Sequence, residues 1–327
     1  MAAQAAGRES SVLLVLSSLG IGGSESKFVK LAGALAARGT KVALAYLNPP
    51  LDLLSRIDPS VAVIPLQRRG KFSMGALRRL AAVIRDSGAT TVVGVNLYAS
   101  LYVALARLVR RFRFIASVNT TEFVGAGQAR RMRLYRHVLR RADLVVFGAE
   151  SQRRLWAGRY GLGADAVQST VLYNGVDTDR FAPARDARHS QAPPRTRYVI
   201  GTVGRLRPEK AHTHLVRATA QLRAAGLDVG AVIVGEGGER AAIEADVRKY
   251  DLEDHVVLAG SADDVRPFLA RMDVFVLPSI GVETFSNAVL EALATGIPVV
   301  SSTAGGMQEL LAWGGGVTLY GDRKSVV

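Results

Sequence analysis

Short apolar runs alternate with longer amphipathic segments along most of the chain. In the first 181 residues the runs are rich in valine, leucine and isoleucine, and they predict strands at Val12–Ser17, Lys41–Leu47, Val61–Pro65, Thr91–Val95, Arg113–Val118, Asp143–Phe147 and Thr170–Leu172. The segments between them predict helices at Ser24–Arg38, Ser73–Asp86, Ala99–Arg110, Gln128–Arg141 and Glu150–Tyr160. Near-continuous apolar strands separated by helices are typical of a parallel sheet that is covered on both faces.

The alternation stops at residues 182–197, which carry three prolines and several small polar residues. Such a stretch is typical of a linker. Beyond it the pattern restarts, with strands predicted at Tyr198–Val203, Gly230–Val234, His255–Ala259, Asp273–Leu277 and Pro298–Ser301 and helices at Ala211–Ala225, Glu239–Tyr250, Asp264–Ala270, Asn287–Thr295 and Met307–Leu311. The sequence therefore predicts an α/β fold of two doubly wound parallel-sheet domains, at residues 1–181 and 198–327.

Composition narrows the function classes. The 327 residues are enough for two domains that each bury a core, and the absence of cysteine excludes disulfides, thiolate zinc sites and a cysteine nucleophile. The formal net charge is +14, but it is unevenly distributed. Residues 1–190 carry 28 Lys/Arg and 12 Asp/Glu, whereas residues 191–327 carry 14 and 16, so the whole excess lies in the first half.

The basic half suggests an acidic partner. Nucleic acid is the first class that a strongly basic chain suggests, but no recognition motif or aromatic platform accompanies the arginines. An anionic membrane surface or an anionic acceptor is favoured instead. Segment 128–141 is a candidate interfacial helix in which apolar residues stand among arginines; alternatively, its apolar side faces the core. These apolar residues are Met132, Tyr135, Val138 and Leu139, and the nearby arginines include Arg130, Arg131, Arg133, Arg136, Arg140 and Arg141.

Targeting signals are not evident in the sequence. The first ten residues lack a basic leader followed by an apolar region, and no run of about 18 uncharged apolar residues occurs. We therefore expect a cytoplasmic protein, and peripheral attachment to the inner face of the plasma membrane remains open.

A glycine-rich loop follows the first predicted strand. Glycines 20, 22 and 23 let the backbone approach a ligand closely, and the helix start after them offers free N–H groups to an anion. The GxGxxG spacing of nicotinamide and flavin sites is absent, and glycine-rich first turns also occur where no ligand binds.

Two cations and two carboxylates follow strands of the second predicted domain. Arg205 and Lys210 could offset charge on a leaving diphosphate, although a solvated basic turn is the alternative. Glu283 lies in a loop, and Glu291 lies on the helix that Asn287 is predicted to cap, so both carboxylates can face one cleft. A carboxylate accepts two hydrogen bonds from a vicinal diol, which a sugar and a ribose each offer. Complementing the helix dipole is the alternative role.

Taken in order, these motifs resemble glycosyltransferase family 4. They are GGSE, YNGVD, GRLRPEK, VGEG, the pair Glu283 and Glu291 spaced as E-x7-E, and ATGIPVVSS. The resemblance implies retaining enzymes of GT-B architecture, in which two Rossmann-like domains face a cleft. It also implies a UDP- or GDP-sugar donor in the C-terminal domain, an acceptor in the N-terminal domain, and no cofactor and no obligatory metal, which agrees with the lack of a DxD motif.

The resemblance also implies roles for individual residues. Arg205 and Lys210 would bind the diphosphate as it leaves, and Glu283 would hold hydroxyls of the transferred sugar. Backbone groups of Phe285, Ser286 and Asn287 would meet the phosphates and Glu291 the ribose. The implied donor contacts also include glycines, with Gly23 at the diphosphate and Gly235 and Gly237 near the nucleobase; the set is Gly22, Gly23, Gly204, Gly235 and Gly237.

Two features depart from the family pattern. Asn119 stands where many family members place a histidine that contacts the sugar, and an amide can hydrogen-bond but cannot shuttle a proton. Family members also normally continue into further helices. We expect a truncated C-terminus whose residues Asp322–Val327 are not native, because they can be back-translated into the start of a common sequencing adapter.

The leading hypothesis is a retaining glycosyltransferase that acts on a lipid-linked, lipopolysaccharide or exopolysaccharide acceptor. A UDP-sugar 2-epimerase of the same architecture is an alternative, disfavoured because the E-x7-E and GRLRPEK pattern belongs to the transferase. A catalytically silent sugar-nucleotide-binding protein is a second alternative, suggested by Asn119 and the early stop.

Overall fold

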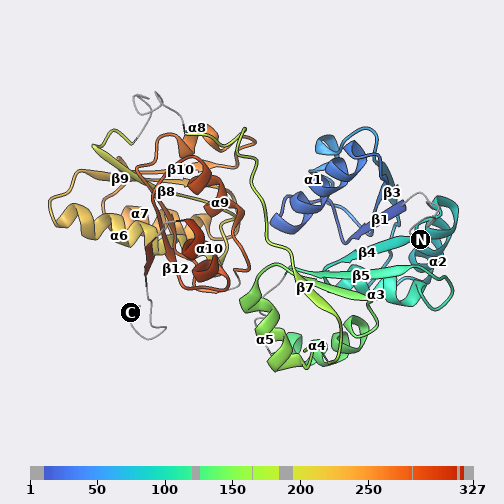
Figure 1. Cartoon of the computed structure of the whole chain (residues 1–327). Helices are drawn as coiled ribbons and strands as arrows, with labels where there is room; N and C mark the ends of the chain where they lie inside the picture. The colour runs from blue at the N-terminus through green and yellow to red at the C-terminus, as the bar shows by residue number, and fades with distance from the viewer. Residues whose placement is uncertain are drawn as a thin grey trace, which may run out of the picture. The chain divides into compact units, whose positions relative to one another are not determined.

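The structure is a computed structural model that describes residues 11–119, 126–163, 165–183, 194–281, 283–314 and 317–319 (Figure 1), with only the backbone for residues 126–131, 134, 313, 314 and 317–319. The chain divides into two compact units, residues 1–173 and 174–327. The division precedes the boundary predicted at residue 181, because Asn174 already donates from Nδ2 to the carbonyl oxygen of Phe285 at 2.7 Å. Residues 184–193 of the predicted linker lie outside the described residues.

The first unit is one parallel sheet with helices on both faces. Its strands follow the order β3-β2-β1-β4-β5-β6-β7, and every pair is parallel. The strands are β1 (Ser11–Leu16), β2 (Lys41–Tyr46), β3 (Ala62–Pro65), β4 (Thr91–Val95), β5 (Arg113–Val118), β6 (Leu144–Phe147) and β7 (Ser169–Val171). The helices are α1 (Gly23–Ala37), α2 (Met74–Ser87), α3 (Asn96–Ala106), α4 (Ala126–Leu139) and α5 (Glu150–Tyr160), with a 3-10 turn η1 (Leu54–Arg56).

The second unit repeats this arrangement. Its sheet has the order β10-β9-β8-β11-β12-β13, again with parallel pairs. The strands are β8 (Tyr198–Val203), β9 (Val229–Val234), β10 (Val256–Gly260), β11 (Val274–Leu277), β12 (Val299–Ser302) and β13 (Val317–Leu319), the last of which the sequence pattern missed. The helices are α6 (His212–Ala224), α7 (Arg240–Lys249), α8 (Arg266–Leu269), α9 (Asn287–Ala294) and α10 (Met307–Gly314), and a 3-10 turn η3 (Pro208–Lys210) precedes α6.

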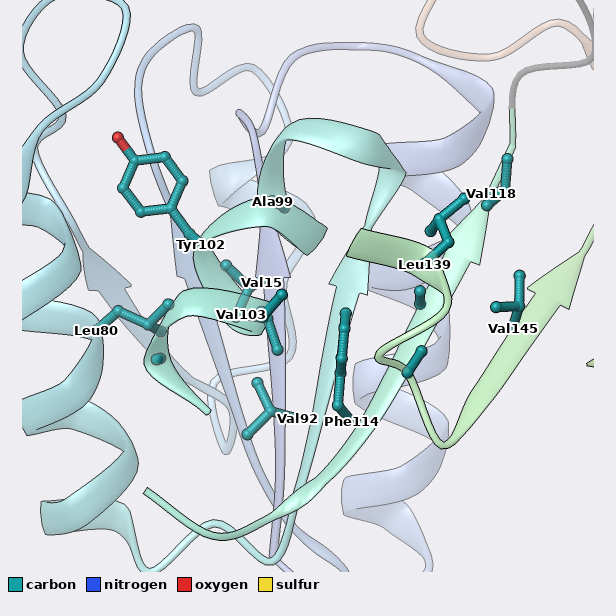
Figure 2. Close-up of a cluster of buried hydrophobic side chains, with 14 of the residues drawn as sticks. Val15, Leu80, Val92, Ala99, Tyr102, Val103, Phe114, Val118, Leu139 and Val145 are labelled. Atoms are coloured by element: carbon teal, nitrogen blue, oxygen red, sulfur yellow. The ribbon is translucent and has the colours of Figure 1, made fainter. Parts of the chain in front are cut away.

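Residues of β1 alternate between two cores on the two faces of the first sheet. Leu13 and Val15 belong to one cluster and Leu14 and Leu16 to the other, because successive side chains of a strand point to opposite faces. Figure 2 shows the first cluster, where side chains of α2, α3 and α4 pack against β1, β4, β5 and β6. Helix α1 covers the other face. In the second unit β9 is buried along its whole length, as expected for a strand that is paired on both sides in a doubly covered sheet.

The interpretation of segment 128–141 as an interfacial helix is wrong. Its apolar residues belong to the core: Met132 and Leu139 are fully buried, and Tyr135 and Val138 pack against the same cluster. The apolar stripe of α4 is therefore used up by packing on the sheet, and the exposed side chains Arg133 and Arg140 are solvated. None of the helices in the described part of the chain is long and apolar enough to span a membrane.

Helix α3 lies unusually close to β4 at Gly94. A Cβ on Gly94 would stand 2.7 Å from the Cα of Ser100, and the Ser100 hydroxyl donates to the Gly94 carbonyl oxygen at 3.0 Å. The substitution Gly94→Ala should lower the free energy of unfolding by about 1 to 3 kcal/mol, because backbone rather than a flexible side chain must move. Urea unfolding measures this. Gly158→Ala, in an open position of α5, is the control and should be neutral or stabilising; equal effects of the two changes would contradict the close approach.

Candidate active site

A buried carboxylate organises the second unit. Glu283 is 5% exposed, and its Oε1 accepts hydrogen bonds from the Ser279 hydroxyl at 2.7 Å and from the Lys210 ammonium group, with which it forms an ion pair. Removing a carboxylate from water is costly unless it is paired and hydrogen-bonded, and both conditions are met here. The structure thus brings together Lys210 and Glu283, which are 73 positions apart in the sequence.

Three loops at the carboxyl ends of neighbouring strands fix this cluster. The Ile280 N–H donates to the Glu209 carbonyl oxygen at 3.0 Å, which ties the loop after β11 to η3 after β8. The Ser302 hydroxyl at the end of β12 donates to the Ser279 carbonyl oxygen at 2.5 Å. Gly305, at φ of 60°, lies so close to the Glu283 carbonyl that a Cβ would overlap it. The position of Glu283 is therefore set by its backbone as well as by its ion pair.

Arg205 is exposed and belongs to the same segment after β8 as Lys210. It follows Gly204, whose N–H donates to the Val234 carbonyl oxygen at 2.9 Å, and has no ion-pair partner among the described residues. Its guanidinium is therefore available to an anion. The role in diphosphate binding remains a prediction.

Gly235 and Gly237 are explained by backbone packing. A Cβ on Gly235 would collide with the Gly204 carbonyl and a Cβ on Gly237 with the Leu206 carbonyl. The Leu206 N–H also donates to the Glu236 carbonyl oxygen at 3.0 Å. Segments 204–206 and 235–237 thus lie directly against each other, which requires residues without a side chain at these two positions. The predicted contact with a nucleobase is a separate matter that stays a prediction.

The N-cap of helix α9 lies one residue earlier than predicted. Ser286, rather than Asn287, is the N-cap: its hydroxyl accepts from the Val289 N–H at 3.4 Å, and Asn287 is the first helical residue. A serine side chain has the length that an N-cap needs to accept from an N–H of the first turn, so the cap is Ser286, one position before the predicted Asn287. Phe285 is buried, and its carbonyl oxygen accepts from Asn174 of the YNGVD motif. Glu291 lies in the second turn of α9, as predicted.

His212 begins α6 next to the cluster and was not predicted as buried. It is 2% exposed, and its Nδ1 has no hydrogen-bond partner among the described residues. Burial lowers the pKa of His212 to about 4 from its ordinary value of 6.5, and the positive charge of Lys210 acts in the same direction. The imidazole is therefore neutral at pH 7.

In the first unit, Gly22 and Gly23 open helix α1 as expected. Gly22 is the N-cap in an extended conformation without a side-chain cap, which leaves N–H groups of the first turn for another acceptor. The carboxylate of Glu25 lies against Gly22, where a Cβ would touch it. Contact of either glycine with a donor diphosphate remains a prediction.

Asn119 is held by its own unit. Its backbone N–H and its Nδ2 donate to Oδ1 of Asn96 at 3.2 and 3.3 Å, and Nδ2 also lies 3.3 Å from the Ser117 hydroxyl. Asn96 adopts a left-handed conformation with φ of 64°, which places its side chain at the start of α3 beside the end of β5. No sequence pattern pointed to this partner. Asparagine is, however, among the few residues that adopt this conformation readily.

Lys27 is a further residue that the sequence pattern did not single out. Its ammonium group donates to the carbonyl oxygen of Leu172 at 2.8 Å, next to the YNGVD motif, and burial lowers its pKa to about 8.

A cavity of about 660 Å³ in the second unit lies away from the cluster of Lys210 and Glu283. It is found near the amino-terminal ends of β11 and β12, with Arg180, Arg266, Met272 and Pro298 among its lining residues.

Two family models match consecutive parts of the chain. Residues 21–180 match the model described as Glycosyltransferase Family 4, and residues 197–325 match the model described as Glycosyl transferases group 1. Together with two doubly wound sheets, these matches show that the chain belongs to glycosyltransferase family 4 and has the GT-B fold.

Two glycosyltransferases with different names are similar in sequence to parts of this chain, and a solved structure has the same fold. The chain is 34% identical to 2-deoxystreptamine glucosyltransferase of Streptomyces kanamyceticus, over 53% of this chain and 46% of that protein. It is also 34% identical to GDP-mannose-dependent alpha-(1-6)-phosphatidylinositol monomannoside mannosyltransferase of Mycolicibacterium smegmatis, over 63% and 56%. The chain thus spans about half the length of these relatives. Anabaena HepE in complex with UDP has the same fold, with a TM-score of 0.79, 22% identity and coverage of 92% of this chain and 82% of that one.

The neutral state of His212 makes a pH-dependent prediction. Its pKa is lowered in the folded state, so between pH 6.5 and about 4 the unfolded chain binds more protons and stability falls as the pH falls. The wild-type protein should therefore lose free energy of unfolding over this pH range, and His212→Gln should lose less of it. The difference should be on the order of 2 to 3 kcal/mol. Urea unfolding at a series of pH values measures the difference between the two proteins. His137→Gln, on the exposed part of α4, controls for loss of an imidazole as such; parallel pH curves for wild type and His212→Gln would refute the assignment.

Proposed function

We propose that the protein is a glycosyltransferase that moves a sugar from a UDP- or GDP-sugar to a glycan or lipid-linked acceptor, with retention of the anomeric configuration. The observation that supports this most is the buried Glu283 carboxylate, held by Lys210 and Ser279 in the unit that also carries the exposed Arg205. A fixed carboxylate paired with one cation, with a second cation on the same segment as Lys210, suits a ligand that has hydroxyls at one end and phosphates at the other.

In this proposal the donor binds to the second unit. Glu283 accepts hydrogen bonds from sugar hydroxyls, and Lys210 and Arg205 neutralise the diphosphate. The first N–H groups of α9, at Ser286 and Asn287, meet a phosphate at the positive end of the helix. Glu291, one turn further along α9, accepts from the ribose hydroxyls.

The chemical step exchanges one bond at the anomeric carbon. The acceptor hydroxyl oxygen bonds to that carbon on the face from which the diphosphate departs, and the hydroxyl proton passes to an oxygen of the leaving phosphate. Such a mechanism needs positioning and stabilisation of negative charge, which Lys210 and Arg205 supply. Asn119 contributes a hydrogen bond and no proton transfer. We further propose that no metal ion takes part, so turnover should be unchanged by a chelator.

The names of similar proteins and the positive charge of the first half of the chain support the proposed donor and acceptor classes. The Mycolicibacterium relative is named for a phosphatidylinositol-linked acceptor and a GDP-mannose donor, and the HepE structure contains UDP. We extend the same chemical classes to this chain: a nucleoside diphosphate sugar, and an acceptor that is lipid-linked or part of a lipopolysaccharide or exopolysaccharide. The basic first half fits work at the inner face of the plasma membrane.

A donor screen should identify the nucleotide. Thermal unfolding in the presence of UDP-, GDP- and ADP-sugars should show a rise in Tm with one nucleotide class and little change with the others, because a ligand stabilises the state that it binds. The selected donor is then tested for release of nucleoside diphosphate, and proton NMR of the product reports the anomeric configuration. Inversion would contradict the retaining mechanism.

Substitutions in the cluster separate an enzyme from a silent binding protein. Glu283→Gln and Lys210→Met should each lower donor turnover by about 100- to 1000-fold, the usual effect of removing a group that stabilises transition-state charge. Arg207→Met, on the same loop but paired with Glu209, is the matched control and should stay near wild type. Binding without any turnover in the wild type would favour the silent protein, and conversion of a UDP-sugar to its C2 epimer without release of UDP would favour the epimerase.

A further inference from the structure

An apolar tip projects from the turn between α3 and β5. Leu108 and Val109 are each 68% exposed, the largest values among the large hydrophobic side chains of the described residues. The turn is ordered by hydrogen bonds from Leu108 and Val109 N–H to the carbonyl oxygens of Leu105 and Ala106, both at 3.1 Å. Phe112, in the same stretch, is buried in the core of the first unit. The exposed pair is thus presented by an anchored turn, which we call the 108–113 turn.

Arginines surround this tip. Arg110, Arg111 and Arg113 of the 108–113 turn are exposed, and so are Arg140 and Arg141 after α4. Arg107 connects the two places, because its guanidinium donates to the Arg141 carbonyl oxygen at 2.6 Å.

The neighbouring acids do not cancel this charge. Asp143 is paired with Arg107 at 2.6 Å, and Asp86 is paired with Arg85 at 2.6 Å. Each acid is thus already matched by one arginine, and the exposed arginines of the tip remain in excess.

This surface and Asn119 lie at opposite ends of the strands of the first sheet. The 108–113 turn leads into β5 and residues 140–143 lead into β6, so both lie at the amino-terminal ends of their strands. Asn119 follows the carboxyl end of β5. A partner that covers the turn therefore leaves the polar cluster of Asn119 and Asn96 uncovered.

We propose that the 108–113 turn docks the first unit on an anionic lipid bilayer, with Leu108 and Val109 entering the interface and the arginines pairing with lipid phosphates. A bilayer offers both an apolar layer and negative charge, which matches both properties of the surface. Nucleic acid binds through its phosphate charge and through bases that stack on aromatic rings. Leu108 and Val109 are aliphatic and give the bases no ring to stack on, so nucleic acid fits this surface less well. This inference rests on the proposed function, because a lipid-linked acceptor is the reason for the enzyme to bind a membrane. The binding itself can be measured without any turnover.

Cosedimentation of the full chain with vesicles tests the docking directly. Wild type should bind phosphatidylglycerol-containing vesicles much more strongly than pure phosphatidylcholine vesicles, and the binding should weaken with salt. Arg110→Glu with Arg111→Glu should weaken binding at least about 25-fold, since each arginine near an anionic surface contributes about fivefold. Leu108→Ser with Val109→Ser should weaken it about tenfold while keeping the salt dependence, because only the apolar contribution is removed.

Matched variants in the second unit show whether position matters. Leu227→Ser changes a leucine that is 47% exposed, and Arg248→Glu with Lys249→Glu makes the same charge change at the end of α7 as the arginine variant of the turn. Both should bind vesicles like wild type, and thermal unfolding should show all variants folded. If Arg248→Glu with Lys249→Glu weakens binding as much as Arg110→Glu with Arg111→Glu does, net charge alone attracts the membrane and the docking surface is overturned.

Other partners are distinguished in the same experiment. Vesicle binding that the two turn variants leave unchanged would overturn the proposal, and so would binding of a homopolymer RNA that depends on the turn while vesicles do not bind. A change in elution volume on gel filtration of Leu108→Ser with Val109→Ser would instead indicate contact between two copies of the chain. Donor turnover should be the same in all these variants. Its absence throughout would refute the proposed function without touching the docking.

Discussion

The second unit depends on the requirement that a buried carboxylate be paired. Glu283 has left water, so it needs a positive charge and hydrogen-bond donors within reach, and it finds them in Lys210 and Ser279. These residues come from loops after β8 and β11. They are held in place by Ser302, the last residue of β12, and by Gly305, which follows β12. Since these three strands are neighbours in the sheet, the cluster forms only when this part of the sheet is complete. Pairing within the protein and readiness to receive a polar ligand are therefore two aspects of one arrangement.

Most of the fold could be predicted from the sequence because both sheets are covered on two faces. Seven apolar runs in the first half became seven strands, and five in the second half became five of the six. The sixth, Val317–Leu319, is too short and too close to glycines to stand out. Helix starts were less certain. Helix α3 begins at Asn96 rather than Ala99 because asparagine adopts the left-handed turn that starts it.

The site was predictable in its residue types and not in its contacts. Glu283 and Lys210 could be selected by motif, but their pairing joins residues far apart in the sequence and follows only from sheet order. Gly235 and Gly237 suggested ligand contact, whereas their close backbone neighbours are residues 204 and 206. The amphipathic pattern of α4 was compatible with a membrane or with the core, since periodicity shows that an apolar face exists and not what covers it.

The sheet order has a consequence for how the chain acquires its structure. The central strand β8 pairs with β9, which follows soon after it, and on its other side with β11, which begins only at Val274. The same holds for β1, whose second partner β4 begins at Thr91. During synthesis each central strand thus waits with one edge unpaired while two further strands and the helices between them are made, two helices for β1 and three for β8. Long-range pairing of this kind slows folding and leaves an apolar edge open to other chains. Rapid coverage by the intervening helices is therefore as much a condition for reaching the fold as for keeping it.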